Sequence, residues 1–159
     1  MENNITKVPT ATLFMAQYLD GEFKRYEFLC YYIALQSIFE GKDTKEMSAF
    51  YGEFAIKVLQ RGWHIGTWKR LQGLMSRMEK EGFIQTAPIR VRAADLWIGD
   101  GRHRFCCAAI LGMNEVFILT FPRAREQYIE RSWFVENDFD PDIIERLDLA
   151  KEELIGKWR

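Results

Sequence analysis

The chain has few of the residues that build metal clusters or disulfide frameworks. It contains three cysteines and two histidines among 159 residues, and no Cys-x-x-Cys motif is present. An odd number of cysteines, two of which are adjacent at Cys106 and Cys107, does not suit a disulfide framework. With so few histidines, a structural zinc site is not expected either. We therefore expect a cytoplasmic protein whose thiols are reduced.

The sequence also lacks a long apolar run, an internal repeat and a strong charge of either sign. No stretch approaches the roughly 18 apolar residues of a membrane span, and the polar residues 1–9 have no apolar core of the signal-peptide type. The formal net charge is −1. No overall basic field is therefore available to bind nucleic acid through its phosphates. Neither a membrane span nor a nucleic-acid partner is expected.

Residues for a packed core are plentiful. Hydrophobic residues make up 48% of the chain and aromatic residues 14%, which excludes a disordered composition. A chain of 159 residues is typical of one domain. We expect a single domain over residues 1–159, consisting of a helical N-terminal extension (1–66), a core (67–121) and C-terminal helices (122–159).

Apolar residues at helical spacing predict most elements of the first half. Residues 1–22 are expected to form a lead-in. The expected helices cover residues 11–18, within this lead-in, and then 24–40, 43–61 and 67–82. The buried side of the third of these is expected to include Ile56 and Leu59. Thr67 is expected to cap the last one.

Short apolar runs change the pattern after Pro88. Strands are expected at residues 89–92, 96–98 and 116–121, and helices at 102–111, at 125–134 and from Asp140-Pro141 onward. The strand at 116–121 is apolar on both faces and is expected to be central. The last helix is expected to bury Leu149. The predicted fold class is α+β, with a helical N-terminal half packed on a small mixed β-sheet.

Residues 98–112, IGDGRHRFCCAAILG, are the most informative stretch. A strand gives way at Gly99-Asp100-Gly101 to a helix, and Gly112 stands where a C-terminal glycine cap belongs. The start of a helix offers free N–H groups and a positive dipole end, which favour phosphate. The side chains of Arg102, His103 and Arg104 would add donors aimed the same way.

The pattern also permits simpler explanations. Asp100 can cap the helix, and His103 and Arg104 can lie on its solvated face. Lys69, Arg70 and Arg77 can bind an acidic partner or form a solvated helix face. Cys106 and Cys107 fit the role of small buried hydrophobic residues better than that of reactive thiols.

The motif Asp100-Gly-Arg-His-Arg104, followed by an alanine-containing helix that ends in Leu-Gly112, resembles the ParB/sulfiredoxin-like superfamily. The upstream Leu71-Gln-Gly-Leu-Met-Ser-Arg-Met-Glu-Lys-Glu-Gly82 and Pro88-Ile-Arg-Val91 resemble the same superfamily, so the resemblance covers residues 67–121. Arg25-Tyr-Glu27, with the helix behind it, resembles ParB-like proteins encoded with surface-polysaccharide synthesis. The resemblance implies a sheet and a phosphate-holding turn of ParB/sulfiredoxin-like type.

Three branches of the superfamily differ at this turn. Sulfiredoxins have a nucleophilic cysteine directly before His-Arg, where this chain has Arg102. The DNA-partitioning CTPases have a glutamate after the glycine and a further arginine, where this chain has Arg102 and Cys106, and no helix-turn-helix half is evident. The small-molecule kinases, such as free-serine kinases, have Asp-Gly-x-His-Arg, which residues 100–104 match in full.

The kinase branch implies a role for each motif residue. The backbone N–H groups of Gly101 and Arg102 would hold phosphates, with Arg104 and His103 donating to their oxygens. Asp100 would hold Mg²⁺ or take the acceptor proton. Glu27 is the candidate for a further catalytic carboxylate, with a solvated residue in a first helical turn as its alternative.

The function expected from this resemblance is a kinase that uses ATP or ADP with Mg²⁺, or CTP in their place. The acceptor would be a small hydroxylated metabolite such as a polyol, a sugar or an amino acid. One alternative is a non-catalytic nucleotide-binding regulatory or scaffold protein, and another is a ParB-like DNA-associated NTPase. The sequence leaves the acceptor and the oligomeric state open.

Overall fold

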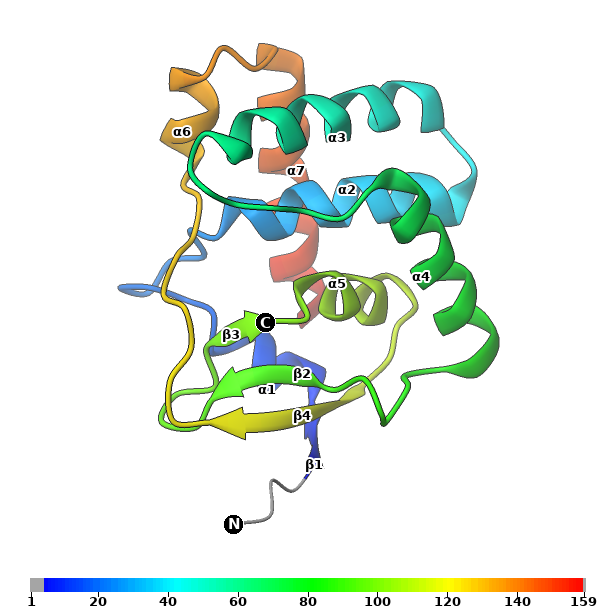
Figure 1. Ribbon diagram of the computed structural model, residues 1–159, viewed down its shortest axis with the longest axis vertical. Helices are drawn as coiled ribbons and strands as arrows, with labels where there is room; N and C mark the ends of the chain where they lie inside the picture. Colours follow the sequence, from blue (N-terminus) through cyan, green and yellow to red (C-terminus); the bar gives the residue numbers. More distant parts are fainter. Residues whose placement is uncertain (1–4, 159) are drawn as a thin grey trace.

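The computed structural model describes residues 5–158. Residues 1–4 of the expected lead-in and residue 159 of the expected C-terminal part lie outside the described residues. Four strands form one mixed sheet at the base of the molecule in the order β1-β4-β2-β3 (Figure 1). They are β1 (Ile5–Pro9), β2 (Ile89–Arg92), β3 (Ile98–Asp100) and β4 (Glu115–Phe121). The strand β4 runs antiparallel to β1 and parallel to β2, and β3 runs antiparallel to β2.

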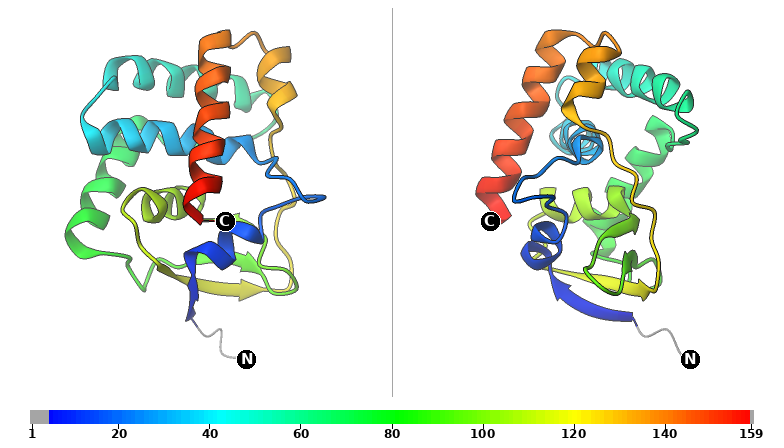
Figure 2. Two further views of the ribbon diagram at one scale, coloured as in Figure 1. Left: turned by 180° about the vertical axis from the view of Figure 1, so that it is seen from behind. Right: turned by 90° about the vertical axis from the view of Figure 1, so that its left-hand side faces the viewer.

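Seven helices lie within the described residues. They are α1 (Thr10–Met15), α2 (Tyr26–Glu40), α3 (Thr44–Leu59), α4 (Trp68–Glu81), α5 (Arg102–Ile110), α6 (Arg131–Glu136) and α7 (Pro141–Trp158). Above the sheet, α5, α2 and α3 follow one another upward, and α4 descends along one side (Figure 1). The helix α7 runs along the back of α2 (Figure 2). None of the described helices is long and apolar enough to cross a membrane.

The helix α2 is the centre of the hydrophobic core. Every residue from Tyr26 to Leu35 is buried, because α3, α5, α7 and α4 all pack against this helix. A helix surrounded in this way has to be apolar on nearly all sides, which is why its sequence shows wide apolar coverage. The same core includes Cys106 and Cys107, which are free and buried, as the sequence predicts.

The structure confirms the mixed helix-and-strand class, the small mixed sheet and the inner position of β4. Two predicted helix ends are also confirmed. The hydroxyl of Thr67 accepts the N–H of Arg70 at 3.2 Å at the start of α4. At the end of α5, Gly112 has a φ of 71° and the N–H of Met113 donates to the carbonyl of Ala108 at 2.9 Å, which is a Schellman cap.

The expected N-terminal extension is not purely helical. Residues 5–9 form β1, which pairs with β4 from Ile5 opposite Leu119 to Pro9 opposite Glu115. This strand was missed because its hydrogen bonds go to residues about 110 positions away in the sequence. The short helix that follows covers Thr10–Met15 rather than residues 11–18.

Two expected elements of the second half are displaced. The helix predicted over 125–134 is present only from Arg131, as α6 (Arg131–Glu136), because residues 123–130 are irregular. Their backbone groups are taken by distant partners: the carbonyl of Ile129 accepts the N–H of Tyr26 at 2.8 Å, and the carbonyl of Arg125 accepts the indole N–H of Trp97 at 2.8 Å. The strand β3 is also shifted by two residues from its expected place, since Leu96 has a φ of 62° in the preceding turn.

Several apolar side chains expected to be buried are exposed. Ile56 is 66% exposed and Leu59 50% exposed on α3, and Leu149 is 64% exposed on α7. These predictions are wrong because α3 and α7 each pack on α2 along one face only, whereas their apolar residues extend beyond that face.

Candidate functional site

The corner between β3 and α5 requires a glycine. Gly101 precedes α5 with a φ of 98°. A Cβ atom at Gly101 would lie 2.9 Å from Nη2 of Arg104 and 3.1 Å from the Cα atom of Ile89. The left-handed backbone and the close approach of β2 both exclude larger residues. The sharp turn leaves the first N–H groups of α5 free of intrahelical partners, as the sequence predicts.

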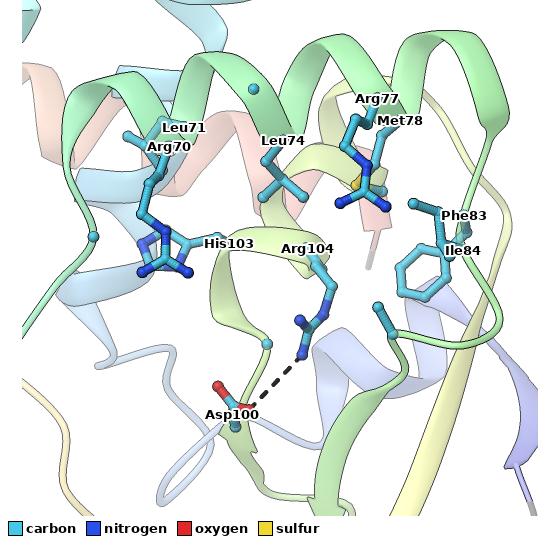
Figure 3. A pocket seen from close by; sticks show the side chains of 14 residues that line it. Arg70, Leu71, Leu74, Arg77, Met78, Phe83, Ile84, Asp100, His103 and Arg104 are labelled. Atoms are coloured by element: carbon cyan, nitrogen blue, oxygen red, sulfur yellow. Dashed lines mark ion pairs between the residues drawn. The ribbon is translucent and has the colours of Figure 1, made fainter.

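A cavity of about 520 Å³ opens beside this corner. Its walls are α4, the loop after α4 and the first turn of α5 (Figure 3). The residues that line it are Gly66, Arg70, Leu71, Gly73, Leu74, Arg77, Met78, Phe83, Ile84, Ala87, Asp100, Gly101, His103 and Arg104. A volume of this size lies in the usual range of small-molecule sites, about 300–1,000 Å³.

The charges in the cavity are mostly positive. Arg70 and Arg77 reach into it from α4, and Arg104 reaches in from α5 (Figure 3). Asp100 is the only acidic side chain among the described residues of the lining. Three guanidinium groups around one carboxylate favour an anionic ligand with several oxygen atoms.

The side chain of Arg104 is incompletely paired. Its Nη2 donates to the carbonyl of Pro88 at 3.1 Å and lies 3.9 Å from Oδ2 of Asp100. Its Nε is buried and has no hydrogen-bond partner. Burial lowers the pKa of Arg104, because the charged form loses hydration in the cavity wall. An anion in the cavity would stabilise that charge.

Asp100 does not cap the helix. It is the last residue of β3, the N-cap is Gly101, and no side chain caps α5. The carboxylate of Asp100 is 69% exposed at the mouth of the cavity, next to Arg104. It is therefore accessible to a ligand.

His103 lies in contact with two tyrosines. Its Nε2 is 3.3 Å from the hydroxyl of Tyr51, and its ring centroid is 4.1 Å from that of Tyr31. Burial and the charges of Arg102 and Arg104 lower the pKa of His103 to about 4. At neutral pH the imidazole is therefore uncharged. In this form it can donate a hydrogen bond to a phosphate oxygen but adds no positive charge.

The side chain of Arg102 points away from the cavity. Its Nε lies 3.8 Å from Oε2 of Glu27, and its guanidinium lies 5.0 Å from the ring centroid of Trp63. The side chain does not line the cavity. Only the backbone N–H of Arg102, at the first position of α5, remains in place for the predicted phosphate contact.

Glu27 belongs to a buried cluster. The carboxylate is fully buried, accepts Nε of Arg25 at 3.2 Å and accepts the backbone N–H of Ile129 at 3.1 Å. The alternative of a solvated first-turn residue is thus wrong. Glu27 does not line the cavity either, so the structure does not bring it together with Asp100.

Arg70 and Arg77 are the cavity residues whose role the sequence left open. They share one face of α4 with Leu74, because positions three and four apart in a helix lie one above the other. Lys69, one position away, is not in the lining. The spacing of Arg70, Leu74 and Arg77 was the available signal, but only the packing of α4 beside α5 shows that this face meets the turn at residues 99–104.

The single carboxylate of the cavity can bind Mg²⁺ only together with phosphate oxygens. No group of three or more His, Cys, Asp or Glu side chains suited to a metal ion exists within residues 5–158. Protein-bound Mg²⁺ commonly has one or two carboxylates, with phosphate and water oxygens completing its octahedron. Asp100 can supply one such carboxylate.

No protein-family model, no curated protein and no solved structure matches this chain. The resemblance to the ParB/sulfiredoxin-like superfamily therefore remains a prediction from the motif residues.

Proposed function

We propose that this chain is a nucleotide-dependent phosphotransferase whose cavity beside Gly101 holds the phosphates of ATP or ADP. The acceptor is the hydroxyl group of a small metabolite, of the class of polyols, sugars or amino acids. The proposal also assigns the sheet and the turn at residues 99–104 to the ParB/sulfiredoxin-like type. The observation that carries it is the convergence of Arg70, Arg77 and Arg104 on one cavity at the start of α5.

Phosphoryl transfer suits this arrangement because it needs positioning and charge stabilisation more than covalent chemistry. The bond between the terminal phosphorus and the bridging oxygen breaks, and a bond forms from that phosphorus to the acceptor oxygen. Arg70, Arg77 and Arg104 would stabilise the phosphate oxygens as their charge shifts. Neutral His103 would donate a hydrogen bond.

The acceptor hydroxyl loses its proton in this reaction. Asp100, exposed at the mouth of the cavity, is the carboxylate in position to accept it or to hold Mg²⁺, which would neutralise phosphate charge when bound. The two roles differ in one observable. If Asp100 holds the metal, Asp100→Asn raises the Mg²⁺ concentration needed for half-maximal rate; if Asp100 is the base, the rate falls at saturating Mg²⁺.

One observation favours a second candidate, a nucleotide-binding regulatory or scaffold protein without turnover. Glu27, the expected further carboxylate, lies in a buried cluster and not in the cavity. The cavity thus contains a single acidic group among its described residues, which is few for a site that must both hold a metal and accept a proton. Such a protein would bind the nucleotide and leave its phosphates intact.

The test is incubation of the purified chain with ATP labelled at the γ-phosphate or ADP labelled at the β-phosphate, Mg²⁺ and a panel of polyols, sugars and amino acids. The expected result is transfer of the label to one class of acceptor, which is lost in Asp100→Ala. Asp142→Ala, which removes an exposed carboxylate from the first turn of α7, is the matched control and should retain activity.

Calorimetry on the same samples separates the candidates. Nucleotide binding without transfer across the panel would favour the regulatory protein. Absence of binding heat with every ribonucleoside di- and triphosphate, with magnesium present, would contradict both candidates. Retardation of duplex DNA at moderate salt would favour the DNA-associated NTPase, and we expect none.

A further inference from the structure

A second cavity of about 230 Å³ lies beside β2 and β3. Gly99 lines the second cavity, and the next residue of the strand, Asp100, lines the first. Its other walls are β2, the end of β4 and the segment after β4, with Arg90, Arg123 and Arg125 among the lining residues. None of the described lining residues is acidic.

The three arginines of the second cavity have no carboxylate partner. Across residues 5–158, no ion pair involves Arg90, Arg123 or Arg125. Nearby Arg92 provides the contrast, because it is paired with both Asp95 and Glu126. An anion bound there would meet three cationic side chains that no carboxylate already neutralises.

The backbone that presents Arg123 and Arg125 is held firmly against β3. The indole N–H of Trp97 donates to the carbonyl of Arg125 at 2.8 Å. Ala124 packs closely against Gly99: a Cβ atom added at Gly99 would lie 2.9 Å from the Cβ atom of Ala124. Since the segment is irregular yet fixed at these points, the two arginines start from defined backbone positions.

The second cavity also lies within electrostatic reach of the phosphate site. In the β2–β3 pair, Arg90 stands opposite Asp100. The positive charge of Arg90 contributes to the lowered pKa of Arg104, which lines the first cavity. A molecule held by Arg90 in the second cavity would therefore lie near Asp100.

We infer that the second cavity binds the acceptor, and that the acceptor carries an anionic group, a phosphate or a carboxylate, held by Arg90, Arg123 and Arg125. This inference rests on the proposed phosphotransferase function and narrows its substrate class from neutral polyols and sugars to anionic hydroxylated metabolites. The anionic group anchors the molecule, and its hydroxyl faces Asp100. Guanidinium groups suit both phosphate and carboxylate because they donate in pairs.

The test is a titration followed by ¹⁵N nuclear magnetic resonance, with and without saturating ADP and Mg²⁺. The probes are glycerol 3-phosphate, glycerate and glycerol, which share a small hydroxylated skeleton and differ in their charge. The amide signals of Gly99 and Ala124 report on the second cavity, and those of Gly73 and Gly101 report on the first. A short single-stranded oligonucleotide serves as a fourth probe.

The double variant Arg123→Ala/Arg125→Ala removes two exposed side chains and is expected to fold. The control Lys42→Ala/Lys45→Ala removes the same charge at two exposed residues, one in the turn after α2 and one in the first turn of α3. We expect one or both anionic probes to shift the second-cavity signals and glycerol to leave them unchanged. Affinity for the anion should fall by about tenfold to a hundredfold in the arginine variant and stay unchanged in the control.

Several results would overturn the inference: equal binding of glycerol and glycerol 3-phosphate, shifts confined to Gly73 and Gly101, or binding of the oligonucleotide alone. Transfer of phosphate to glycerol at a rate that the arginine variant leaves unchanged would also overturn it while the proposed function stands. Anion binding at the second cavity without any phosphoryl transfer would instead support the anionic site and contradict the phosphotransferase.

Discussion

At the level of single residues, His103 shows how burial selects a chemical role. A histidine beside two arginines resembles a third cation in the sequence. In the structure it contacts Tyr31 and Tyr51, and its pKa of about 4 keeps it neutral at physiological pH. In the proposed phosphotransferase it would therefore contribute a directed hydrogen bond and no positive charge.

The lowered pKa of His103 predicts a pH dependence of stability. The unfolded histidine takes up a proton near pH 6.5 and the folded one near pH 4. Between these values the unfolded state binds more protons, so His103 makes the protein less stable as the pH falls, by at most about 1.4 kcal/mol per pH unit. Below pH 4 the histidine is protonated in both states, and its effect on the free energy of unfolding no longer changes with pH.

Urea unfolding of the wild type and His103→Gln at pH 4, 5, 6 and 7 measures this effect. The free energy of unfolding of the wild type should fall more steeply from pH 6.5 to 4 than that of the variant. Parallel curves would show that the histidine titrates alike in both states. Carboxylates common to both proteins cancel in the difference.

Arg104 is predicted to carry part of the nucleotide affinity. Its guanidinium lines the cavity with one carboxylate at 3.9 Å, and a bound phosphate would offset its charge. Arg104→Ala should weaken nucleotide binding by about 1.5–3 kcal/mol, the usual value of a charge-assisted hydrogen bond. Arg104→Lys should recover only part of this loss, since lysine lacks the planar guanidinium group that donates two parallel hydrogen bonds.

Calorimetric titration with ADP and Mg²⁺ gives these affinities. Arg61→Ala, at an exposed turn outside both cavities, is the control. An unchanged affinity in Arg104→Ala would remove this residue from the site.

At the level of elements, the β3–α5 corner depends on Gly101. An alanine there would have to adopt a left-handed φ of 98° and place its Cβ 3.1 Å from the backbone of β2. Gly101→Ala should lower the free energy of unfolding by at least about 1–2 kcal/mol from the backbone conformation alone. It should also displace Arg104, whose Nη2 would be 2.9 Å away.

Gly52 offers the matched control for this prediction. It lies in the middle of α3, and nothing lies within 4 Å of a Cβ atom placed there. Gly52→Ala should therefore raise the stability by about 0.5–1 kcal/mol. Urea denaturation of both variants measures the two opposite changes in the free energy of unfolding. A neutral or stabilising Gly101→Ala would contradict the required left-handed turn.

At the level of the whole molecule, the cluster around Glu27 connects segments that are far apart in the sequence. Arg25 donates to Glu27, to the side chain of Gln17 at 2.7 Å and to the carbonyl of Ile98 at 3.1 Å. Glu27 also accepts the N–H of Ile129. The cluster thereby holds the residues after α1, the start of α2, β3 and the segment before α6 together.

Removing the charge of Glu27 should destabilise the entire fold. Arg25 is fully buried between the rings of Phe28 and Trp97, and Glu27→Gln would leave its charge without a counterion. Breaking a buried ion pair in this way typically costs about 3–5 kcal/mol. Thermal and urea unfolding should show this loss.

Glu46→Gln is the control, because Glu46 is also an acidic first-turn residue but is exposed on α3. Its effect should stay below about 1 kcal/mol. If Glu27→Gln instead folds with wild-type stability and loses phosphoryl transfer, Glu27 is a catalytic residue and the structural role is wrong.

Local chemistry in the sequence was sufficient for much of this protein. Apolar spacing predicts α2, α3 and α4, and Thr67, Gly112 and Asp140-Pro141 mark helix ends that the structure confirms. The glycine-bounded turn before α5 is predicted correctly as well. These features depend on neighbours within a few residues, whose types are visible in the chain.

Only the tertiary structure decided which distant groups meet. The pairing of β1 with β4 and the burial of Glu27 beside Ile129 join residues about 100 or more positions apart. The positions of Arg70 and Arg77 in one cavity with Arg104 depend on the packing of α4 beside α5. Long-range packing and buried charge pairs leave no periodic signal in a single sequence, because their partners are chosen by the three-dimensional arrangement of the whole core.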